Sequence, residues 1–427
     1  MLNHEKLVCL GTGEELTDDG LILANGNSPK PAFLRAKYHK KDLTVRKDLP
    51  GLYQFSDWLP INRVLQGSGS PVTYLSQGLG KHLGLTRLYI TFNGYWPEKE
   101  ARMMTGTFKE CEAFSVCARF PKESGKVLVV ASAGNTARAF MKVASENDIP
   151  LVVVVPGKNM GSLWHIGDLN PCVKIIAAGG DSDYSDAIRL SDIICGIPGF
   201  YPEGGAKNVA RRDGMGTTVL SAVTTIGEIP DYYFQAVGSG TGAIAAHENN
   251  LRFIQSGKYG QKMMSLQCSQ NEPFVPIFEA WKADSRSIPE VDEDEARQKI
   301  DSINAKVLSN RKPPYSIMGG LYDCLKASSG DMLNATNGEA AQAQKLFREL
   351  EGCDICPEGG IALASLMKKV QNGNIAKDAV IMLNITGGGF ERLAAEYQLT
   401  SAKANLVIDR KDFILDSIQE KVLKLMR

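Results

Sequence analysis

The stretch that decides the fold is Lys126-Val-Leu-Val-Val-Ala-Ser-Ala-Gly-Asn-Thr-Ala137, in which an apolar run leads directly into small and polar residues. The aliphatic residues 127–131 predict a buried strand, and the residues after them predict a turn followed by a helix. A strand, a turn and a helix in this order form the repeating unit of a parallel sheet. The turn then lies at the carboxyl end of its strand, where open α/β folds bind ligands.

The same pattern recurs on both sides of this stretch. We predict further strands at 88–92, 151–155, 173–178, 232–237, 263–268 and 379–385. Helices are predicted at 108–119, 135–145, near Leu163, and at 185–194, 243–255, 339–350 and 413–426, and the charged stretch 292–308 predicts an exposed helix or a lid. Short turns join these units, which is typical of parallel sheets covered by helices.

The predicted fold class is therefore α/β, with two doubly wound parallel-sheet domains and a binding site between them. We expect residues 1–95 to form an N-terminal arm and the first strands of a large domain. Residues 96–215 are expected to form a small domain, and residues 216–427 the rest of the large one.

Composition excludes several classes of function. The 427 residues contain 48 Lys and Arg and 48 Asp and Glu, so the net charge is zero and nothing draws the chain toward nucleic acid or anionic membranes. No apolar run of about 18 residues predicts a membrane span, and we expect a cytoplasmic protein. The nine cysteines fit reduced thiols. Cys9 lacks the second cysteine of a zinc knuckle, because Thr12 occupies that position, and no metal site is expected.

Lys109 lies in Met104-Thr-Gly-Thr-Phe-Lys-Glu110, at the predicted start of a helix. A lysine amine becomes a nucleophile when desolvation or a neighbouring cation favours its neutral form, and it can then bond covalently to a carbonyl. The small residues before Lys109 would let a cofactor approach closely. The alternative is an ordinary surface lysine on a helix.

The Ser132-Ala-Gly-Asn-Thr136 turn precedes a helix start whose backbone N–H groups favour a carboxylate. Ser132, Ala133, Gly134 and Thr136 are therefore candidates for substrate binding, and the Asn135 amide can donate a hydrogen bond to a ring hydroxyl. A plain helix cap explains the same residues equally well.

Gly238-Ser-Gly-Thr-Gly242 follows a predicted strand and opens a helix, an arrangement that binds phosphate through backbone amides. Gly238, Ser239, Gly240, Thr241 and Gly242 are the candidate phosphate ligands. The next strand, 265–271, lacks the acidic residue of a dinucleotide site, and no Gly-Lys-Ser/Thr follows, so a lone phosphate monoester fits best. A simple tight turn is the alternative.

Three other groups of residues complete the candidate site. Thr386 ends an apolar strand before Gly387-Gly-Gly389, where its hydroxyl could meet a pyridine nitrogen without protonating it; a plain turn is the alternative. Lys207, Arg211 and Arg212 are candidates for a second anion, with a solvated surface as the alternative. Cys353 and Cys356 are interpreted as packing residues. A reactive lysine, a phosphate loop and a neutral hydroxyl are together what a pyridoxal 5′-phosphate site requires.

With these residues assembled, the chain resembles the fold type II pyridoxal phosphate enzymes of the tryptophan synthase β-like class, and among them the threonine synthase branch. The resemblance extends from Trp58 to the last sheet strand and includes Leu65-Gln-Gly-Ser-Gly-Ser-Pro71. It implies that Lys109 holds the cofactor covalently, that Asn135 contacts its 3′-oxygen, that residues 238–242 bind its phosphate, and that Thr386 contacts its ring nitrogen. Residues 132–136 would take the substrate carboxylate.

Departures from the branch imply a different substrate. Threonine synthases typically have Ser-Phe-Lys-Asp, whereas this chain has Thr107-Phe-Lys-Glu-Cys-Glu112. This form resembles the branch members that make L-cysteate from O-phospho-L-serine and sulfite for coenzyme M biosynthesis, and a homo-oligomer is expected. Threonine formation from O-phosphohomoserine and water, sulfide transfer as in cysteine synthesis, and a non-catalytic nucleotide- or amino-acid-binding regulator are the alternatives.

Overall fold

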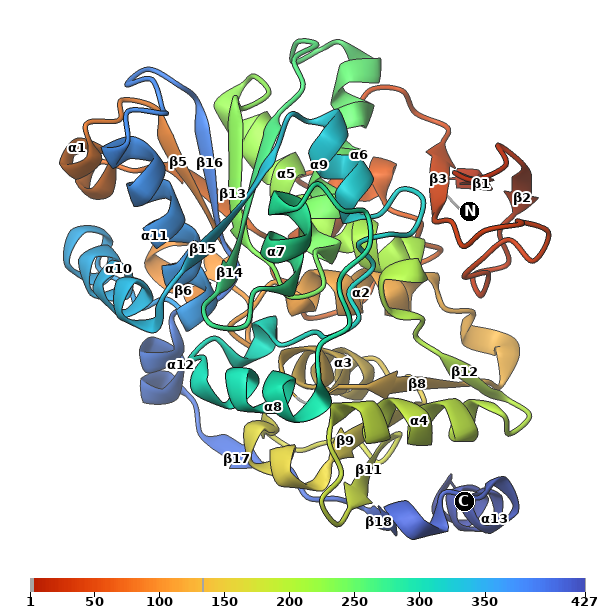
Figure 1. Ribbon diagram of the computed structural model, residues 1–427. Coiled ribbons are helices and arrows are strands. Elements are labelled where there is room, and N and C mark those ends of the chain that lie inside the picture. The colour runs from red at the N-terminus through yellow and green to blue at the C-terminus, as the bar shows by residue number, and fades with distance from the viewer. Residues whose placement is uncertain (1–3, 133, 427) are drawn as a thin grey trace.

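The computed structural model describes residues 4–132 and 134–426, which fold around two parallel sheets (Figure 1). The larger sheet has the strand order β15-β14-β13-β16-β5-β4. Its strands are β4 (Val72–Leu75), β5 (Leu88–Phe92), β13 (Tyr232–Ala236), β14 (Ser265–Asn271), β15 (Asp331–Ala335) and β16 (Ile381–Ile385). All neighbours pair in parallel except the edge strand β4, which is antiparallel to β5. The carboxyl ends of β5, β16 and β13 therefore lie side by side, at the same end of the sheet.

The smaller sheet has the strand order β12-β8-β9-β11-β18, and all of its pairs are parallel. Its strands are β8 (Val127–Ala131), β9 (Leu151–Pro156), β11 (Val173–Gly179), β12 (Phe200–Pro202) and β18 (Leu406–Asp409). The chain returns to this sheet at its end, because β18 pairs with β11 and α13 (Leu415–Met426) packs against α4 (Tyr184–Cys195). The expected boundaries placed this last segment in the large domain, and here the structure differs.

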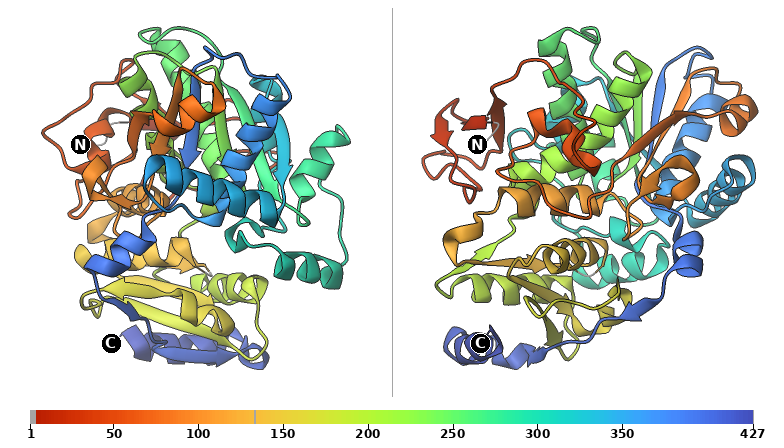
Figure 2. Two further views of the ribbon diagram at one scale, coloured as in Figure 1. Left: turned by 90° about the vertical axis from the view of Figure 1, so that its left-hand side faces the viewer. Right: turned by 180° about the vertical axis from the view of Figure 1, so that it is seen from behind.

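Helices cover both faces of each sheet, as the two further views show (Figure 2). Those nearest the site are α2 (Lys109–Arg119), α3 (Asn135–Glu146), α5 (Val209–Ile226), α6 (Thr241–Ser256) and α11 (Pro357–Gln371). Besides α4 and α13, the others are α1 (Gly78–Leu83), α7 (Pro276–Lys282), α8 (Glu293–Ser302), α9 (Leu321–Ala327), α10 (Asn337–Glu351) and α12 (Phe390–Glu396). Helix α5 was not predicted, because it is buried on nearly every side and so lacks the one-sided apolar period of a surface helix.

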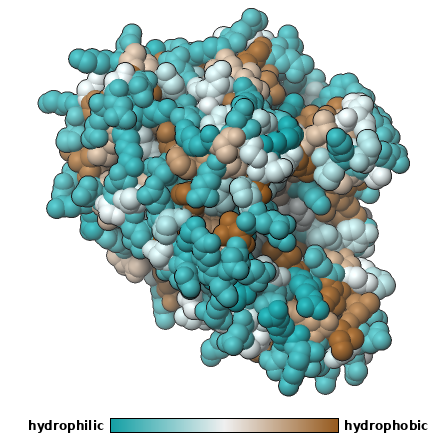
Figure 3. Space-filling view, in the orientation of Figure 1, coloured by the Kyte–Doolittle hydropathy of each residue, from teal (hydrophilic) through white to brown (hydrophobic). Residues whose placement is uncertain are grey.

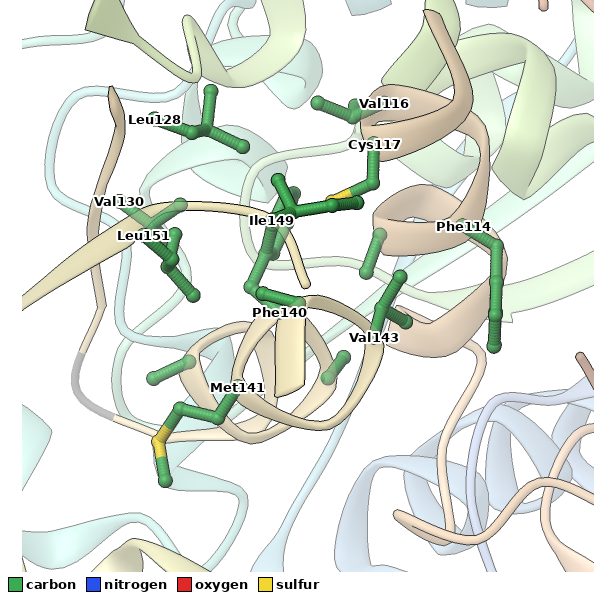
Figure 4. Packing of buried hydrophobic residues seen from close by; sticks show 14 of the residues in the cluster. Phe114, Val116, Cys117, Leu128, Val130, Phe140, Met141, Val143, Ile149 and Leu151 are labelled. Atoms are coloured by element: carbon green, nitrogen blue, oxygen red, sulfur yellow. The ribbon is translucent and has the colours of Figure 1, made fainter. Parts of the chain in front are cut away.

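The core of the smaller unit fixes the helix that carries Lys109. Phe114 and Val116 of α2 are buried with Phe140 of α3 against Leu128 and Leu151 of the sheet (Figure 4). Burying an aromatic or branched side chain of this size stabilises the fold by about 1.5–3 kcal/mol. The start of α2 is thus held on a rigid, well-packed support.

The N-terminal arm forms a small antiparallel sheet of its own, at the right of Figure 1. Its strands are β1 (His4–Cys9), β2 (Glu15–Thr17) and β3 (Leu34–Tyr38). Cys9 is fully buried at the end of β1. Within the described residues, no three His, Cys, Asp or Glu side chains gather as a metal ion would require, and no helix is long and apolar enough to cross a membrane.

The region around Leu163 differs from its prediction. Instead of a helix, a short 3-10 turn (Gly157–Ser162) leads into β10 (Trp164–Ile166), which pairs with β17 (Leu399–Ser401). Two shorter strands, β6 (Tyr95–Trp96) and β7 (Ala101–Arg102), form a hairpin before the lysine segment.

The charged stretch 292–308 contains α8 and a 3-10 turn (Lys306–Leu308), and most residues of α8 are exposed on the largely hydrophilic face of Figure 3. Arg311, just beyond it, donates a hydrogen bond of 2.7 Å to Asp183 at the start of α4. This segment therefore connects the two units.

Candidate active site

Lys109 is the first residue of α2, and backbone hydrogen bonds attach its segment to the Thr386–Gly389 turn. The Phe108 N–H donates to the Thr386 carbonyl at 3.0 Å, and the Gly388 N–H donates to the Gly106 carbonyl at 3.0 Å. Two motifs that are far apart in the sequence therefore lie side by side. The side chain of Thr386, which follows β16, is buried at this junction.

Glu112 joins the lysine to the asparagine turn. The Lys109 ammonium lies 3.3 Å from Glu112 Oε2, and the Thr136 hydroxyl donates to Glu112 Oε1 at 2.8 Å. The Glu112 side chain is completely buried, whereas that of Lys109 is 19% exposed. The carboxylate thus ties the first turn of α2 to the first turn of α3.

The asparagine turn lies where β8 ends and α3 begins, as the strand–turn–helix pattern predicts. The Asn135 amide oxygen accepts a hydrogen bond from Arg138, whose guanidinium also donates to the Ser162 carbonyl at 2.9 Å. Burial lowers the pKa of Arg138 to about 10. Ser132 is buried and its hydroxyl accepts a hydrogen bond from the Gly134 N–H at 3.3 Å. Ala133, which was predicted with them, lies outside the described residues.

The glycine-rich loop follows β13, the parallel neighbour of β16, so it lies at the same sheet edge as Thr386. Gly240 has φ +75° immediately before α6, in the left-handed region that favours glycine. A Cβ atom at Gly238 would lie 2.8 Å from the Val307 carbonyl oxygen, and one at Gly242 would lie 2.6 Å from Gln235 Oε1. Backbone contact at Gly238 and the positive φ of Gly240 favour glycine there, whereas a side chain at position 242 would have to displace the end of Gln235.

These residues fit a pyridoxal 5′-phosphate group. The loop presents backbone N–H groups at the start of α6, as a phosphate requires. The Thr107 hydroxyl beside Lys109 is buried and has no hydrogen-bond partner among the described residues. A lysine, a buried hydroxyl in need of a partner and a phosphate-sized loop therefore converge at the junction of the two units.

Of the three predicted substrate cations, only Arg211 reaches this site. Its guanidinium lies 3.4 Å from Glu112 and is bound by Glu203 at 2.6 and 2.8 Å. Arg212 was predicted wrongly, because its fully buried side chain pairs with Glu248 at 3.0 Å. Neighbouring residues on a helix point about 100° apart, so both arginines cannot face one site.

Lys207 lies outside the site as well: it is exposed at the end of the 3-10 turn Gly205–Lys207, which precedes α5. Burial raises the pKa of Asp192 on α4, and the positive charge of Lys207 opposes that rise.

Two site residues, Glu112 and Arg138, were not singled out from the sequence. Glu358, in the first turn of α11, is buried, and this burial raises its pKa against the opposing charges of Arg138 and Lys109. Glu112 and Arg138 each stand three residues after a predicted site residue, Lys109 or Asn135. That spacing places them on the same helix face, a signal that could have found them.

Cys353 and Cys356 are buried free thiols, as expected of packing residues. The Cys356 N–H donates to the Gly387 carbonyl at 3.1 Å, which attaches the start of α11 to the threonine turn. Burial raises the pKa of both thiols, that of Cys353 to about 12.

Comparison with known proteins agrees with this geometry. The family model of pyridoxal-phosphate dependent enzymes matches residues 76–387. The chain is 44% identical over 414 residues to a cysteate synthase of Methanosarcina acetivorans, covering 97% of this chain and 99% of the relative. It is 46% identical over 418 residues to a cysteate synthase of Methanocella paludicola, covering 97% of each.

Solved structures share the fold at low sequence identity. Maize serine racemase superposes with a TM-score of 0.58 at 15% identity, over 76% of this chain and 92% of that one. A tomato threonine deaminase superposes with a TM-score of 0.54 at 14% identity, over 79% and 91%. The two parallel sheets, the family model and the near full-length relatives together show that the chain belongs to the pyridoxal-phosphate dependent enzymes and, among them, to the cysteate synthase family.

Proposed function

We propose that this enzyme converts O-phospho-L-serine and sulfite to L-cysteate and phosphate. The observation that carries the proposal is the identity of 44–46% to two cysteate synthases over 97% of the chain. The reaction is a replacement at the β-carbon: the carbon–oxygen bond to phosphate breaks and a carbon–sulfur bond to sulfite forms. No oxidant or reductant is needed, because phosphate leaves with the electron pair of the broken bond and sulfite supplies the new pair.

Pyridoxal 5′-phosphate, when bound, supplies the electron sink that makes the α-proton of an amino acid acidic. In our proposal Lys109 holds it covalently, residues 238–242 bind its phosphate, Asn135 contacts its 3′-oxygen and Thr386 contacts its ring nitrogen. The closeness of Lys109 and Thr386 and the close packing around Gly238 support these roles. A neutral threonine hydroxyl leaves the ring nitrogen unprotonated, which suits elimination and replacement better than transamination.

Lys109 is also the proposed general base. Once the amino acid has displaced it, its free amine lies where it can remove the α-proton, and after sulfite has added it returns a proton to the same carbon. The 19% exposure of its side chain leaves it accessible to a substrate. Glu112 at 3.3 Å stabilises the ammonium that forms in between.

Anions are bound by two further groups in this proposal. Ser132, Gly134 and Thr136 take the substrate carboxylate at the amino end of α3, whose first N–H groups and dipole favour negative charge. Arg211 is the cation for the leaving phosphate and the incoming sulfite, since it is the predicted cation that contacts the site network. Ala133 belongs to the same predicted turn.

Colour tests the cofactor roles. The purified protein supplied with pyridoxal 5′-phosphate should absorb at roughly 410–420 nm, and borohydride should remove this band. Lys109→Ala should lack it, whereas Lys207→Ala, which changes an exposed lysine outside the site, should keep it. A Lys109→Ala protein that retains a borohydride-sensitive band would contradict the assignment of Lys109.

Substrate choice is tested by product analysis. The enzyme is given O-phospho-L-serine or O-phosphohomoserine, each with and without sulfite, and phosphate release and product mass are followed. We expect L-cysteate only from phosphoserine with sulfite. Threonine from phosphohomoserine without cysteate from phosphoserine would overturn the proposal, as would a clear preference for sulfide over sulfite. We also propose a homo-oligomer, which light scattering of the purified enzyme tests.

A further inference from the structure

The buried carboxylate of Glu112 lies between two cations, one on each oxygen atom. Its Oε2 atom lies 3.3 Å from the Lys109 ammonium, and its Oε1 atom lies 3.4 Å from Arg211 Nη2. Arg211 has a second carboxylate, Glu203, which binds it with two hydrogen bonds of 2.6 and 2.8 Å and is not paired with Lys109. Glu112 is therefore the carboxylate that can sense whether the lysine amine is free.

Sulfite poses a chemical problem for such an enzyme, if the proposed function holds. Its sulfur lone pair adds to the carbon of an aldehyde or of a carbon–nitrogen double bond. The π electrons then move to the heteroatom, which takes a proton, so the addition needs no oxidant. Sulfite that reached the resting enzyme would attack the double bond through which Lys109 holds the cofactor. The anion is useful only after the amino acid has displaced Lys109.

We propose that Glu112 is a positioning residue that controls when Arg211 accepts an anion. While Lys109 is bonded to the cofactor, Glu112 pairs with Arg211, and Arg211 is neutralised by two carboxylates. When the amino acid releases Lys109, its ammonium shares the Glu112 carboxylate with Arg211, as the two distances of 3.3 and 3.4 Å show. Arg211 is then less completely neutralised and attracts sulfite or phosphate more strongly.

The burial of these groups supplies the energy for this exchange. The Glu112 side chain is 0% exposed, and a buried carboxylate strongly favours contact with at least one cation. When Lys109 loses its charge, the attraction between Glu112 and Arg211 therefore becomes stronger. When the Lys109 ammonium returns, this attraction becomes weaker. The Thr136 hydroxyl, which donates to the same Oε1 atom at 2.8 Å, holds the carboxylate between the two partners. Arg211 is itself only 12% exposed, so an anion can approach it over a small area.

The test compares sulfite binding in two states of the loaded enzyme. In the resting state, without amino acid, sulfite is titrated until the 410–420 nm band is half bleached. In the substrate-occupied state, the KM for sulfite is measured at saturating phosphoserine. For Glu112→Gln, which removes the charge but keeps the shape, we expect half-bleaching at about tenfold lower sulfite than for the unchanged enzyme. We expect the KM to stay within about twofold.

Glu203→Gln is the matched control, because it removes a carboxylate from Arg211 that is not paired with Lys109. Glu203→Gln should lower the sulfite concentration at half-bleaching and the KM for sulfite by the same factor. In the double variant Glu112→Gln/Arg211→Gln, the sulfite concentration at half-bleaching should no longer be lowered as it is by Glu112→Gln alone. If Glu112→Gln does not retain the band, Glu112→Asp takes its place: it keeps the charge on a shorter side chain, so its band should be half bleached at less sulfite than that of the unchanged enzyme.

Equal bleaching concentrations for Glu112→Gln and the unchanged enzyme would overturn the inference. So would a Glu203→Gln enzyme that changes only the resting state, or a gain that survives the loss of Arg211. The bleaching experiment uses sulfite and the resting enzyme alone. It can therefore fail while L-cysteate is still formed, and it can succeed while the proposed product is absent.

Discussion

Gly214→Ala tests how closely α2 must pack to place Lys109. Gly214 lies on α5 against α2, where a Cβ atom would lie 2.8 Å from Ser115 Cβ and closer still to the Cys111 carbonyl oxygen. Ordinary contact begins at 3.4 Å, so α2 must move by at least 0.6 Å, the difference between these two distances. The atoms it meets first belong to the backbone, which has no rotamer by which to avoid the new methyl group.

The expected effect is a loss of both stability and rate. Overpacking of this kind costs about 1–3 kcal/mol. A shift approaching 1 Å in a catalytic group can lower the rate by as much as about 10²-fold, and Cys111 follows Lys109 by only two residues. We therefore expect Gly214→Ala to keep the cofactor band, to unfold at lower urea concentration, and to lose about tenfold to a hundredfold in kcat.

Gly338→Ala is the matched control, because Gly338 also lies in a helix but its Cβ would have only one neighbouring atom, at 4.0 Å. It should leave kcat unchanged and stabilise the protein by up to about 1 kcal/mol, since alanine favours helix. Urea unfolding and steady-state rates of the two variants are compared with the unchanged enzyme. A Gly214→Ala enzyme with unchanged stability and unchanged kcat would refute this account of the helix contact.

Three further predictions concern charge and pH. Asp18→Asn leaves the buried Arg119 guanidinium without a charged partner and should cost about 3–5 kcal/mol in urea unfolding, whereas an unchanged midpoint would contradict this. Burial lowers the pKa of His247 from 6.5 to about 4, so protons bind the unfolded chain first as pH falls. Stability should therefore drop by up to about 3 kcal/mol between pH 6.5 and 4, an effect that His247→Gln removes in pH-dependent unfolding. Arg311→Ala breaks a partly exposed pair with Asp183, so it should cost less than about 1 kcal/mol and nothing at 1 M salt, as unfolding at two salt concentrations will show.

Local patterns predicted most strands of the two parallel sheets. The aliphatic run before Ser132 and the apolar run before Thr386 both form strands, β8 and β16, because β-branched and aliphatic side chains suit a sheet buried on both faces. The same reasoning failed near Leu163, where a short apolar segment forms a separate two-stranded antiparallel sheet with β17. A segment this short is compatible with helix or strand, and its distant partner decides which.

Membership of the sheets was less predictable than their strands. The segment 406–409 continues the smaller sheet beside β11, although more than 200 residues come between them and most of these belong to the larger unit. The strand that a returning segment pairs with depends on which edge strands of the sheets are still unpaired at that point of the chain. The residues of the segment itself do not indicate this. The predicted boundary at residue 216 could not anticipate that return.

The sequence by itself determined the units of this protein and its chemistry. Lys109 begins a helix, Thr386 follows a buried strand, and the glycines at 238–242 separate a strand from a helix, because each of these depends on residues within one short segment. Only the tertiary structure decided that Arg211 and not Arg212 faces the site, and that Glu112 lies between Lys109 and Arg211. The reason is physical: such contacts depend on the rotation of one helix against another, which is set by packing over the whole core.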